Sequence, residues 1–462
     1  MNIAKRVIAA SMLAVIAAAP AQAKGLKLRI KPKSLSFGKV MAGTTSAAKI
    51  VTLSNRNSVT LSVGPITASA PFAETDDCTP SIAAGGSCQI SVTFRAGTPS
   101  KPKGTKEQGS LTISDDAAKS PQTVKLKGIA FGTTAAARIF VTDSADYVVA
   151  YPLASNGNVA PSATITGSNT GLANPYAIAV DSSGNVYVAN CESCVNDGAG
   201  PDSVDIYPAG SNGNVAPIST ITGSNTGLDY PYAIAVDSSG NVYVANCSYS
   251  CGLDLTPESD SITVYPAGSN GNAAPIATIT GSNTGLYAPL GIAVDSSGNV
   301  YVANVNDDLT FGDAGIVTVY PTGSNGNVAP IAAITDAYSE NNGGSLAGGI
   351  AVDSSGNVYV ANCGICGSGS VPDSIDVLPA GSNGNVVPSA SIAGSNTGLS
   401  VPTGVALDSS GNIYVLNFVS HPGGAGFITV YPAGSNGNAA PSAMIVGPAT
   451  DLTSPAGIAV GP

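Results

Sequence analysis

A short turn sequence that returns at a nearly constant interval constrains the fold of this chain more than any other feature. Asp-Ser-Ser-Gly-Asn occurs five times, at intervals of 55 to 58 residues, beginning at Asp181, Asp237, Asp295, Asp353 and Asp408. Ser-Asn-Gly-Asn occurs six times, at intervals of 53 to 58 residues, beginning at Ser155, Ser211, Ser269, Ser324, Ser382 and Ser435. Such a repeat predicts one supersecondary unit per repeat, with neighbouring units burying each other's apolar faces.

Each repeat contains four short strand candidates separated by turn residues. Apolar residues alternate or run continuously within them. In the first complete repeat they cover residues 177–180, 186–190, 204–207 and 219–222. Asp181 can cap the hairpin that it begins, and Gly184 can supply the positive φ that this hairpin needs. Four antiparallel strands repeated around an axis are typical of a β-propeller blade.

The two ends of the repeat region predict the number of blades. Residues 139–142, 147–151 and 163–166 supply a second, third and fourth strand without a first. Residues 457–460 supply a first strand with nothing after it. The two fragments make one blade closed by a 1+3 strand overlap, and the five complete repeats raise the prediction to a six-bladed β-propeller over residues 137–462.

The repeat also resembles a known family. Its pattern is Pro-x-Gly/Ala-Ile-Ala-Val-Asp-x-x-Gly-Asn-Val-Tyr-Val-Ala-Asn, followed later by Ile-x-Val-Tyr, and it resembles the NHL repeat and related bacterial six-bladed propellers. It departs from the commonest NHL pattern by carrying Asn where that family often has Asp, at Asn190, Asn246, Asn304, Asn362 and Asn417. The resemblance implies a scaffold that binds proteins, RNA or sugars, with lyase or lactonase activity in some members.

The N-terminal residues have the features of a secretory signal. Lys5 and Arg6 precede an apolar run over residues 7–19, and Ala21-Gln22-Ala23 is a small-x-small cleavage site. No later apolar stretch is long enough to span a bilayer, so we expect no transmembrane segment after cleavage. The sequence predicts a signal peptide over residues 1–23 and a secreted or periplasmic mature protein.

Residues 24–132 predict a separate all-β domain. Strand candidates cover residues 49–53, 59–63, 88–94, 111–114 and 123–127. Cys88, Ile90, Val92 and Phe94 fall on one face of their strand, which predicts a half-buried strand.

This domain also resembles a known type. The runs Ser34-Leu-Ser-Phe-Gly-Lys-Val-Met-Ala-Gly-Thr, Val51-Thr-Leu-Ser-Asn and Cys88-Gln-Ile-Ser-Val-Thr-Phe resemble the immunoglobulin-like Hydin-type or choice-of-anchor D domain of exported bacterial proteins. The resemblance implies an adhesive or spacer module. With a linker at residues 133–136, the predicted chain is an Ig-like β-sandwich followed by the propeller.

Charge divides the chain in the same way. Residues 24–136 hold 15 basic and 6 acidic residues, whereas residues 137–462 hold one basic residue, Arg138, and 23 acidic residues. A domain with a single arginine cannot displace phosphate counterions, so nucleic acid is excluded as a partner of the propeller. The basic segment fits an anionic polymer or cell surface, a solvated face, or a face docked on the acidic domain.

The eight cysteines fall into local pairs. Cys78 and Cys88 are expected to pair across a loop. The other six lie just after the second strand of three repeats, as Cys191/Cys194, Cys247/Cys251 and Cys363/Cys366. Two C-x-x-C-like pairs can form a Cys₄ zinc site, and a redox-active pair is a second alternative. Export and the isolation of each pair favour disulfides, so no metal is predicted there.

Residues for catalysis are scarce in this sequence. His421, the only histidine, lies in a Gly-rich loop. The inner strands repeat Ile-Ala-Val-Asp without Glu, Lys, Arg or His, and we expect nothing to break their symmetry at the axis. The turn aspartates of Asp-Ser-Ser-Gly-Asn are better explained as turn caps than as calcium ligands. No catalytic residue and no cofactor is predicted.

The loops between the second and third strands vary most and carry the candidate ligand-binding residues. They combine carboxylates with aromatic rings: Asp197, Asp202, Asp254, Glu258, Asp260, Asp307, Asp308, Asp313, Tyr249 and Phe311. In a propeller these loops share one face with the connections between blades. Such a rim suits a carbohydrate, a cationic peptide or bridging calcium, and its alternative is an acidic, soluble rim without a ligand.

These observations favour an exported, non-enzymatic binding or scaffold protein. It would present the propeller loop face to a carbohydrate or protein ligand. One alternative is a calcium-assisted lyase or lactonase that uses the acidic loop residues. Another is a structural surface or matrix component.

Overall fold

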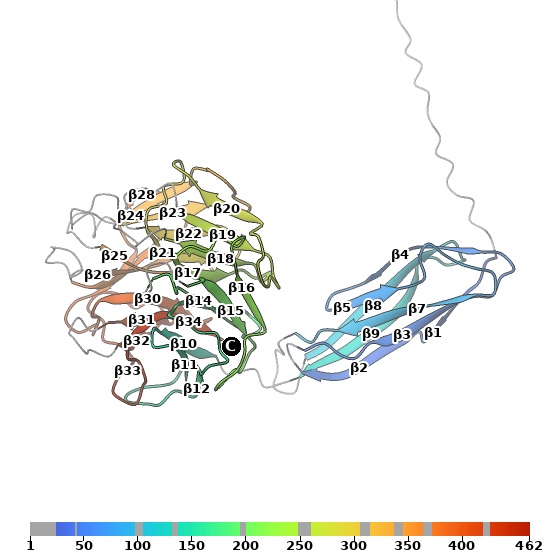
Figure 1. Ribbon diagram of the computed structural model, residues 1–462, viewed down its shortest axis with the longest axis horizontal. Coiled ribbons are helices and arrows are strands. Elements are labelled where there is room, and N and C mark those ends of the chain that lie inside the picture. Colours follow the sequence, from blue (N-terminus) through green and yellow to red (C-terminus); the bar gives the residue numbers. More distant parts are fainter. Residues whose placement is uncertain are drawn as a thin grey trace, which may run out of the picture. The chain divides into compact units, whose positions relative to one another are not determined.

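The structure is a computed structural model that describes residues 25–41, 44–97, 105–131, 137–194, 200–247, 260–304, 315–336, 345–363, 372–418 and 426–462. The chain divides into two compact units, Met1–Thr134 and Ala135–Pro462. The regular elements of the described residues are β-strands (Figure 1). Within these ranges no helix has the length and apolar character to cross a membrane. The chain is an all-β protein, as its strand patterns predict.

The first unit consists of two sheets. One has the order β1 (Leu28–Lys31), β3 (Lys49–Asn55), β7 (Ser87–Phe94), β5 (Phe72–Asp76). The other has the order β2 (Ser34–Met41), β9 (Gln122–Phe131), β8 (Thr105–Asp115), β4 (Leu61–Ala68), β6 (Ser81–Ile82). β2 and β9 pair in parallel, which the sequence did not predict.

One hydrophobic core lies between these two sheets. Cys88, Ile90, Val92 and Phe94 are all buried in it, which confirms their predicted shared face on β7. Cys78 is buried in the same core and forms a disulfide with Cys88, with 5.1 Å between the two Cα atoms.

The described residues of the second unit form six sheets, numbered here along the chain. Sheet 1 has the order β12 (Ala163–Thr166), β11 (Tyr147–Pro152), β10 (Arg138–Asp143), β34 (Pro455–Gly461). Sheet 2 has β13 (Pro175–Val180), β14 (Val186–Asn190), β15 (Ser203–Tyr207), β16 (Ser219–Thr222). Sheet 3 has β17 (Pro231–Val236), β18 (Val242–Asn246), β19 (Ser261–Tyr265), β20 (Ala277–Thr280).

The remaining three sheets repeat this order with one addition. Sheet 4 has β21 (Pro289–Val294), β22 (Val300–Asn304), β23 (Ile316–Tyr320), β24 (Ala332–Asp336), with β28 (Gly384–Val386) as a fifth, parallel strand. Sheet 5 has β25 (Ser345–Val352), β26 (Val358–Cys363), β27 (Ser374–Leu378), β29 (Ala390–Ala393). Sheet 6 has β30 (Pro402–Leu407), β31 (Ile413–Asn417), β32 (Phe427–Tyr431), β33 (Ala443–Ile445).

The innermost strands of these sheets contact one another in a closed order. β34 contacts β13, and the contacts continue through β17, β21, β25 and β30 back to β34. In sheet 1, β34 pairs with β10, so that Ile139 faces Val460 across the ladder. Separate apolar clusters fill the spaces between neighbouring sheets. In one of them, Val204 of sheet 2 packs with Val244 and Tyr265 of sheet 3. Each sheet therefore buries its faces against its neighbours.

The Asp-Ser-Ser-Gly-Asn hairpins form as the sequence predicts. In the first, the Asp181 carboxylate accepts hydrogen bonds from the backbone N–H groups of Ser183 at 2.8 Å and Asn185 at 2.9 Å. Gly184 has a φ of 83°. The carboxylate oxygens are thus satisfied inside their own turn.

The Ser-Asn-Gly-Asn turns connect each sheet to the next at the outer edge, and we call these contacts the outer latches. In the latch between sheets 1 and 2, Asn212 Oδ1 accepts the Thr164 backbone N–H at 2.9 Å, and Asn214 Oδ1 accepts that of Asn169 at 2.7 Å. Six asparagines occupy the position of Asn212 and each accepts a backbone N–H of the neighbouring sheet: Asn156, Asn212, Asn270, Asn325, Asn383 and Asn436.

Candidate functional site

A cavity of about 330 Å³ lies where the inner strands of the second unit begin. Residues from all six inner strands line it. In every strand one lining residue stands two positions before a lining Ile or Val, and we call these residues the axial ring: Tyr176, Tyr232, Leu290, Gly348, Thr403 and Ala456. We call the space itself the axial cavity. Its ring is asymmetric, although the strands around it are nearly identical in sequence.

The axial cavity opens on the face that carries the loops after the second strands. Pro175, the first residue of β13, pairs with Asn190, the last residue of β14. The start of each inner strand and the loop after the second strand therefore lie at the same end of the sheet. Phe418, which directly follows β31, also lines the cavity.

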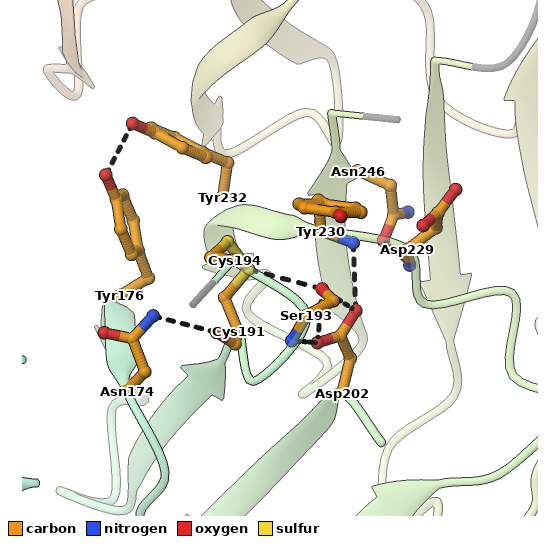
Figure 2. The surroundings of a disulfide bond; sticks show 10 residues. All are labelled: Asn174, Tyr176, Cys191, Ser193, Cys194, Asp202, Asp229, Tyr230, Tyr232 and Asn246. Atoms are coloured by element: carbon orange, nitrogen blue, oxygen red, sulfur yellow. Dashed lines mark hydrogen bonds between the residues drawn. A yellow bond between two sulfur atoms is a disulfide. The ribbon is translucent and has the colours of Figure 1, made fainter. Parts of the chain in front are cut away.

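Two neighbouring sheets supply paired tyrosines to the axial ring. The Tyr176 and Tyr232 ring centroids are 4.2 Å apart with the planes inclined by 49°, and the two hydroxyl oxygens are hydrogen-bonded at 2.6 Å. Both residues are half-buried. Figure 2 shows the two rings and the hydrogen bond between their hydroxyl groups. The pair offers an aromatic surface with polar groups at its edge.

Sheet 6 supplies the other notable groups of the cavity wall. In the order of contacts around the ring, β30 lies opposite β17, which carries Tyr232. Phe418 keeps 36% of its surface exposed, and the Thr403 Oγ1 atom is buried without a hydrogen-bond partner among the described residues. Among the described residues that line the cavity, none carries a charge.

Asp202 and Asp260, two of the predicted ligand-binding residues, lie in the sheet contacts and not on an exposed rim. Asp202 is 9% exposed and Asp260 is 6% exposed. Asp202 accepts hydrogen bonds from the Ser193 hydroxyl at 2.8 Å and from the Tyr230 backbone N–H of sheet 3 at 2.9 Å (Figure 2). Asp260 accepts the Ala288 backbone N–H at 2.7 Å.

The same carboxylate contact recurs at four sheet boundaries. Its acceptors are Asp146, Asp202, Asp260 and Asp373, and its donors are the backbone N–H groups of Asn174, Tyr230, Ala288 and Val401. The donor residues have φ between 41° and 49°, a conformation that side chains other than Gly adopt only when other contacts hold it. These carboxylates stabilise strained connections between sheets, and their oxygens are engaged there. Spacing along one sequence does not reveal this role, because the donor lies in the next repeat.

The other predicted ligand-binding residues lie outside the described residues: Asp197, Asp254, Glu258, Asp307, Asp308, Asp313, Tyr249 and Phe311. His421 also lies outside them.

The cysteines of the loop face are described in part. Cys191 and Cys194 form a disulfide, and Cys363 is also disulfide-bonded. Cys247 is buried, whereas Cys251 and Cys366 lie outside the described residues. Asn174 Nδ2 donates to the Cys191 carbonyl oxygen at 2.8 Å, which attaches this loop to the connection that precedes β13.

The asparagines that distinguish this repeat from the commonest NHL pattern are buried and structural. Asn190 Oδ1 accepts the Ala173 backbone N–H at 3.2 Å, and Asn190 Nδ2 donates to Asp205 at 2.8 Å. Burial raises the pKa of Asp205 to about 6, although hydrogen bonds from Thr220 and Asn190 act in the opposite direction. Asp205 does not line the axial cavity.

One expectation about the inner strands was wrong. The sequence predicted that nothing would break their symmetry, whereas the axial ring carries Tyr at 176 and 232 and different residues in the other sheets. The sequence did contain the signal for this asymmetry, because position x of the repeated Pro-x-Gly/Ala pattern varies from repeat to repeat. It could not be assigned to the cavity before the strand starts were known to meet there.

Comparison with known proteins supports the propeller architecture. A family model for a β-propeller repeat matches residues 218–245. Together with the repeated sheets, this match identifies the second unit as a β-propeller. No curated protein matches the chain.

Solved structures resemble this chain at low sequence identity. A protein of unknown function from Bacteroides caccae is 11% identical, with 71% of this chain and 99% of that chain covered and a TM-score of 0.45. A putative oxidoreductase (glucose dehydrogenase) from Thermus thermophilus is 14% identical, with 63% and 92% covered and a TM-score of 0.40. A gluconolactonase from Xanthomonas campestris is 12% identical, with 60% and 82% covered and a TM-score of 0.34. Identity this low says nothing about the activity of the present chain.

Proposed function

We propose that this protein is an exported, non-enzymatic binding protein that presents the loop face of a six-bladed propeller to a carbohydrate. Its six blades are the six sheets, with β34 and β10–β12 as the composite blade. The first unit, with its two sheets around one core, is the Ig-like adhesive or spacer module. The sequence of residues 1–23 supports export to the periplasm or beyond.

The observation that carries this proposal is the axial cavity with its paired tyrosines. A concave site with aromatic walls and a few polar groups is the usual form of a small-molecule site. Tyrosine combines an apolar ring with a hydroxyl group, as a sugar-binding surface requires. The main alternatives are that this face binds a protein ligand or that the protein acts as a scaffold.

Catalysis has less support than binding in the described residues. The predicted carboxylates that the structure describes, Asp202 and Asp260, already accept backbone hydrogen bonds between sheets. A calcium-assisted lyase or lactonase would therefore depend on the remaining acidic loop residues. We keep that activity as an outcome of the test below.

The test is an array of glycans and cell-wall polymers probed with the mature chain, residues 24–462, with calcium and with chelator. We expect binding to at least one polysaccharide, equal with and without calcium, and no product on prolonged incubation. A defined product that disappears with chelator would replace the proposal with the lyase or lactonase alternative. A blank array with concentration-dependent self-association would favour a matrix component, and a blank array without it would favour a protein ligand.

A further inference from the structure

We infer that the axial cavity holds one uncharged pyranose unit of the ligand, stacked on the Tyr176–Tyr232 pair. This inference rests on the proposed function and adds the chemistry of the bound unit and the residues that contact it. Four features support it: the size of the cavity, the absence of charged residues from its described lining, its aromatic wall and its departure from the repeat.

Size and charge limit the occupant. The cavity volume of about 330 Å³ lies at the lower end of small-molecule sites, which suits a single sugar unit better than a peptide segment. The described lining includes no Lys, Arg, His, Asp or Glu. A charged ligand group would lose its hydration without gaining a charged partner from the described lining, so this lining favours an uncharged unit over a uronic acid.

The polar groups of the lining suit a molecule with several hydroxyl groups. The Tyr176 and Tyr232 hydroxyls lie 2.6 Å apart and can exchange further hydrogen bonds with a ligand. Across the ring, the buried Thr403 Oγ1 has no hydrogen-bond partner in the part of the chain that the structure describes. A buried hydroxyl without a partner is uncommon in a folded protein, and a ligand hydroxyl or a water would satisfy it.

The two tyrosines of the aromatic wall are not needed to form the repeated sheet. The four other sheets close the same ring with Leu290, Gly348, Thr403 and Ala456. Residues of very different size thus occupy this position in different sheets. A pair of tyrosines in two adjacent sheets therefore has a reason other than stability, and stacking against the apolar face of a sugar supplies one.

The repeat itself provides the variants for the test. Replacing Tyr176 and Tyr232 with Leu copies the residue of sheet 4 at both positions. Ile218→Ser is the matched control, because Ile218 is 62% exposed on sheet 2 and the equivalent residue of sheet 1 is Ser162. The probes are methyl glucoside, methyl galactoside, methyl mannoside and N-acetylglucosamine, with glucuronate as the charged probe. Binding is measured by saturation-transfer NMR on the mature chain.

We expect at least one neutral probe to bind the wild-type protein and the Ile218→Ser variant equally. Affinity should fall by about tenfold or more in the double Leu variant, and glucuronate should bind more weakly than the neutral probe by a similar factor. Circular dichroism and the Tm report whether the double variant is folded. If it is not, Tyr232→Leu alone and the shift of tyrosine ring resonances in the wild-type protein replace it.

Three results would overturn the inference: no neutral probe binds the wild-type protein, the folded Leu variants bind as well as wild type, or glucuronate binds equally well. Polymer binding on the array that survives both tyrosine substitutions would leave the proposed function intact and place the ligand elsewhere on the loop face. A blank array with the wild-type protein would instead remove the proposed function.

Discussion

The outer edge and the axis of the propeller are built from the same six sheets, yet they differ sharply in how far those sheets agree. At the outer edge the same asparagine forms the same backbone hydrogen bond at every boundary, from Asn156 to Asn436. At the axis, by contrast, the six residues of the axial ring are of five different types. Positions that hold neighbouring sheets together are constrained by hydrogen-bond geometry. The axial position makes no such bond in common, so its residue can differ from sheet to sheet.

We call the pairing of β34 with β10 in sheet 1 the seam, and it should show the largest effect because β34 closes the ring of inner strands between β30 and β13. Deleting residues 455–462 removes β34 and exposes β10, β13 and β30, which it contacts. We expect the second unit to lose cooperative thermal unfolding, because the deletion opens the ring of inner strands and the whole stability of a domain is only about 5–15 kcal/mol. Thermal circular dichroism of the mature chain measures this.

A synthetic peptide of residues 455–462 provides the control for this deletion. Added in excess, it should restore part of the lost transition by pairing again with β10. If the truncated chain unfolds with an unchanged Tm, the ring does not depend on its closing strand.

Much of this framework could be predicted from the sequence, because it follows from local patterns. Turn residues and alternating apolar residues mark each strand, and the unmatched fragments at residues 139–166 and 457–460 predict the seam that β10 and β34 form. The outer latches could not be predicted in this way. Asn212 and Thr164 are 48 residues apart, and their contact depends on the register between two sheets.

Replacing Asp205 should produce the next largest effect, a change in the free energy of unfolding that depends on pH. Sheet 3 has Thr263 at this position, where Asn246 Nδ2 donates to Thr263 Oγ1 at 3.1 Å. Asp205→Thr therefore copies an existing arrangement and removes a buried carboxyl group. Burial raises the pKa of Asp205 from 3.8 to about 6, so the folded state holds its proton more tightly than the unfolded state does.

The sign of the effect follows from this order of pKa values. Protonation favours the folded wild-type protein, so the contribution of Asp205 to stability falls as pH rises from about 4 to about 6. The advantage of Asp205→Thr over wild type should grow by about 2 kcal/mol between pH 4 and pH 7. Urea unfolding at both pH values measures it. Thr263→Asp should show the opposite trend, and a difference that does not vary with pH would contradict the assignment.

The composition of the axial ring could not be predicted from the sequence. Tyr176 and Tyr232 stood in the sequence as variable residues of a repeated pattern. Their meeting depends on the inclination of neighbouring strands around the axis, and no local pattern encodes it. The same holds for Asp202 and Asp260. Their loop positions suggested exposure, whereas the structure gives them backbone donors in the connections that lead into the next sheets.

The smallest expected effect is the loss of stability when an outer latch is broken. Comparing two latches tests whether the outer edge is as uniform as the axial ring is varied. Asn214 accepts a backbone N–H from Asn169, 45 residues away, and Asn158 accepts one from Ala449, 291 residues away, both at 2.7 Å. Replacing either asparagine with Ala should lower the free energy of unfolding by about 1 kcal/mol, because the bond and its exposed setting are the same. Sequence separation enters the rate of folding through loop closure, so it should not make the equilibrium costs differ. Urea unfolding of the two variants measures both values. A much larger loss for Asn158→Ala would show that the seam carries strain which the internal boundaries do not share, and the latches would then not be equivalent.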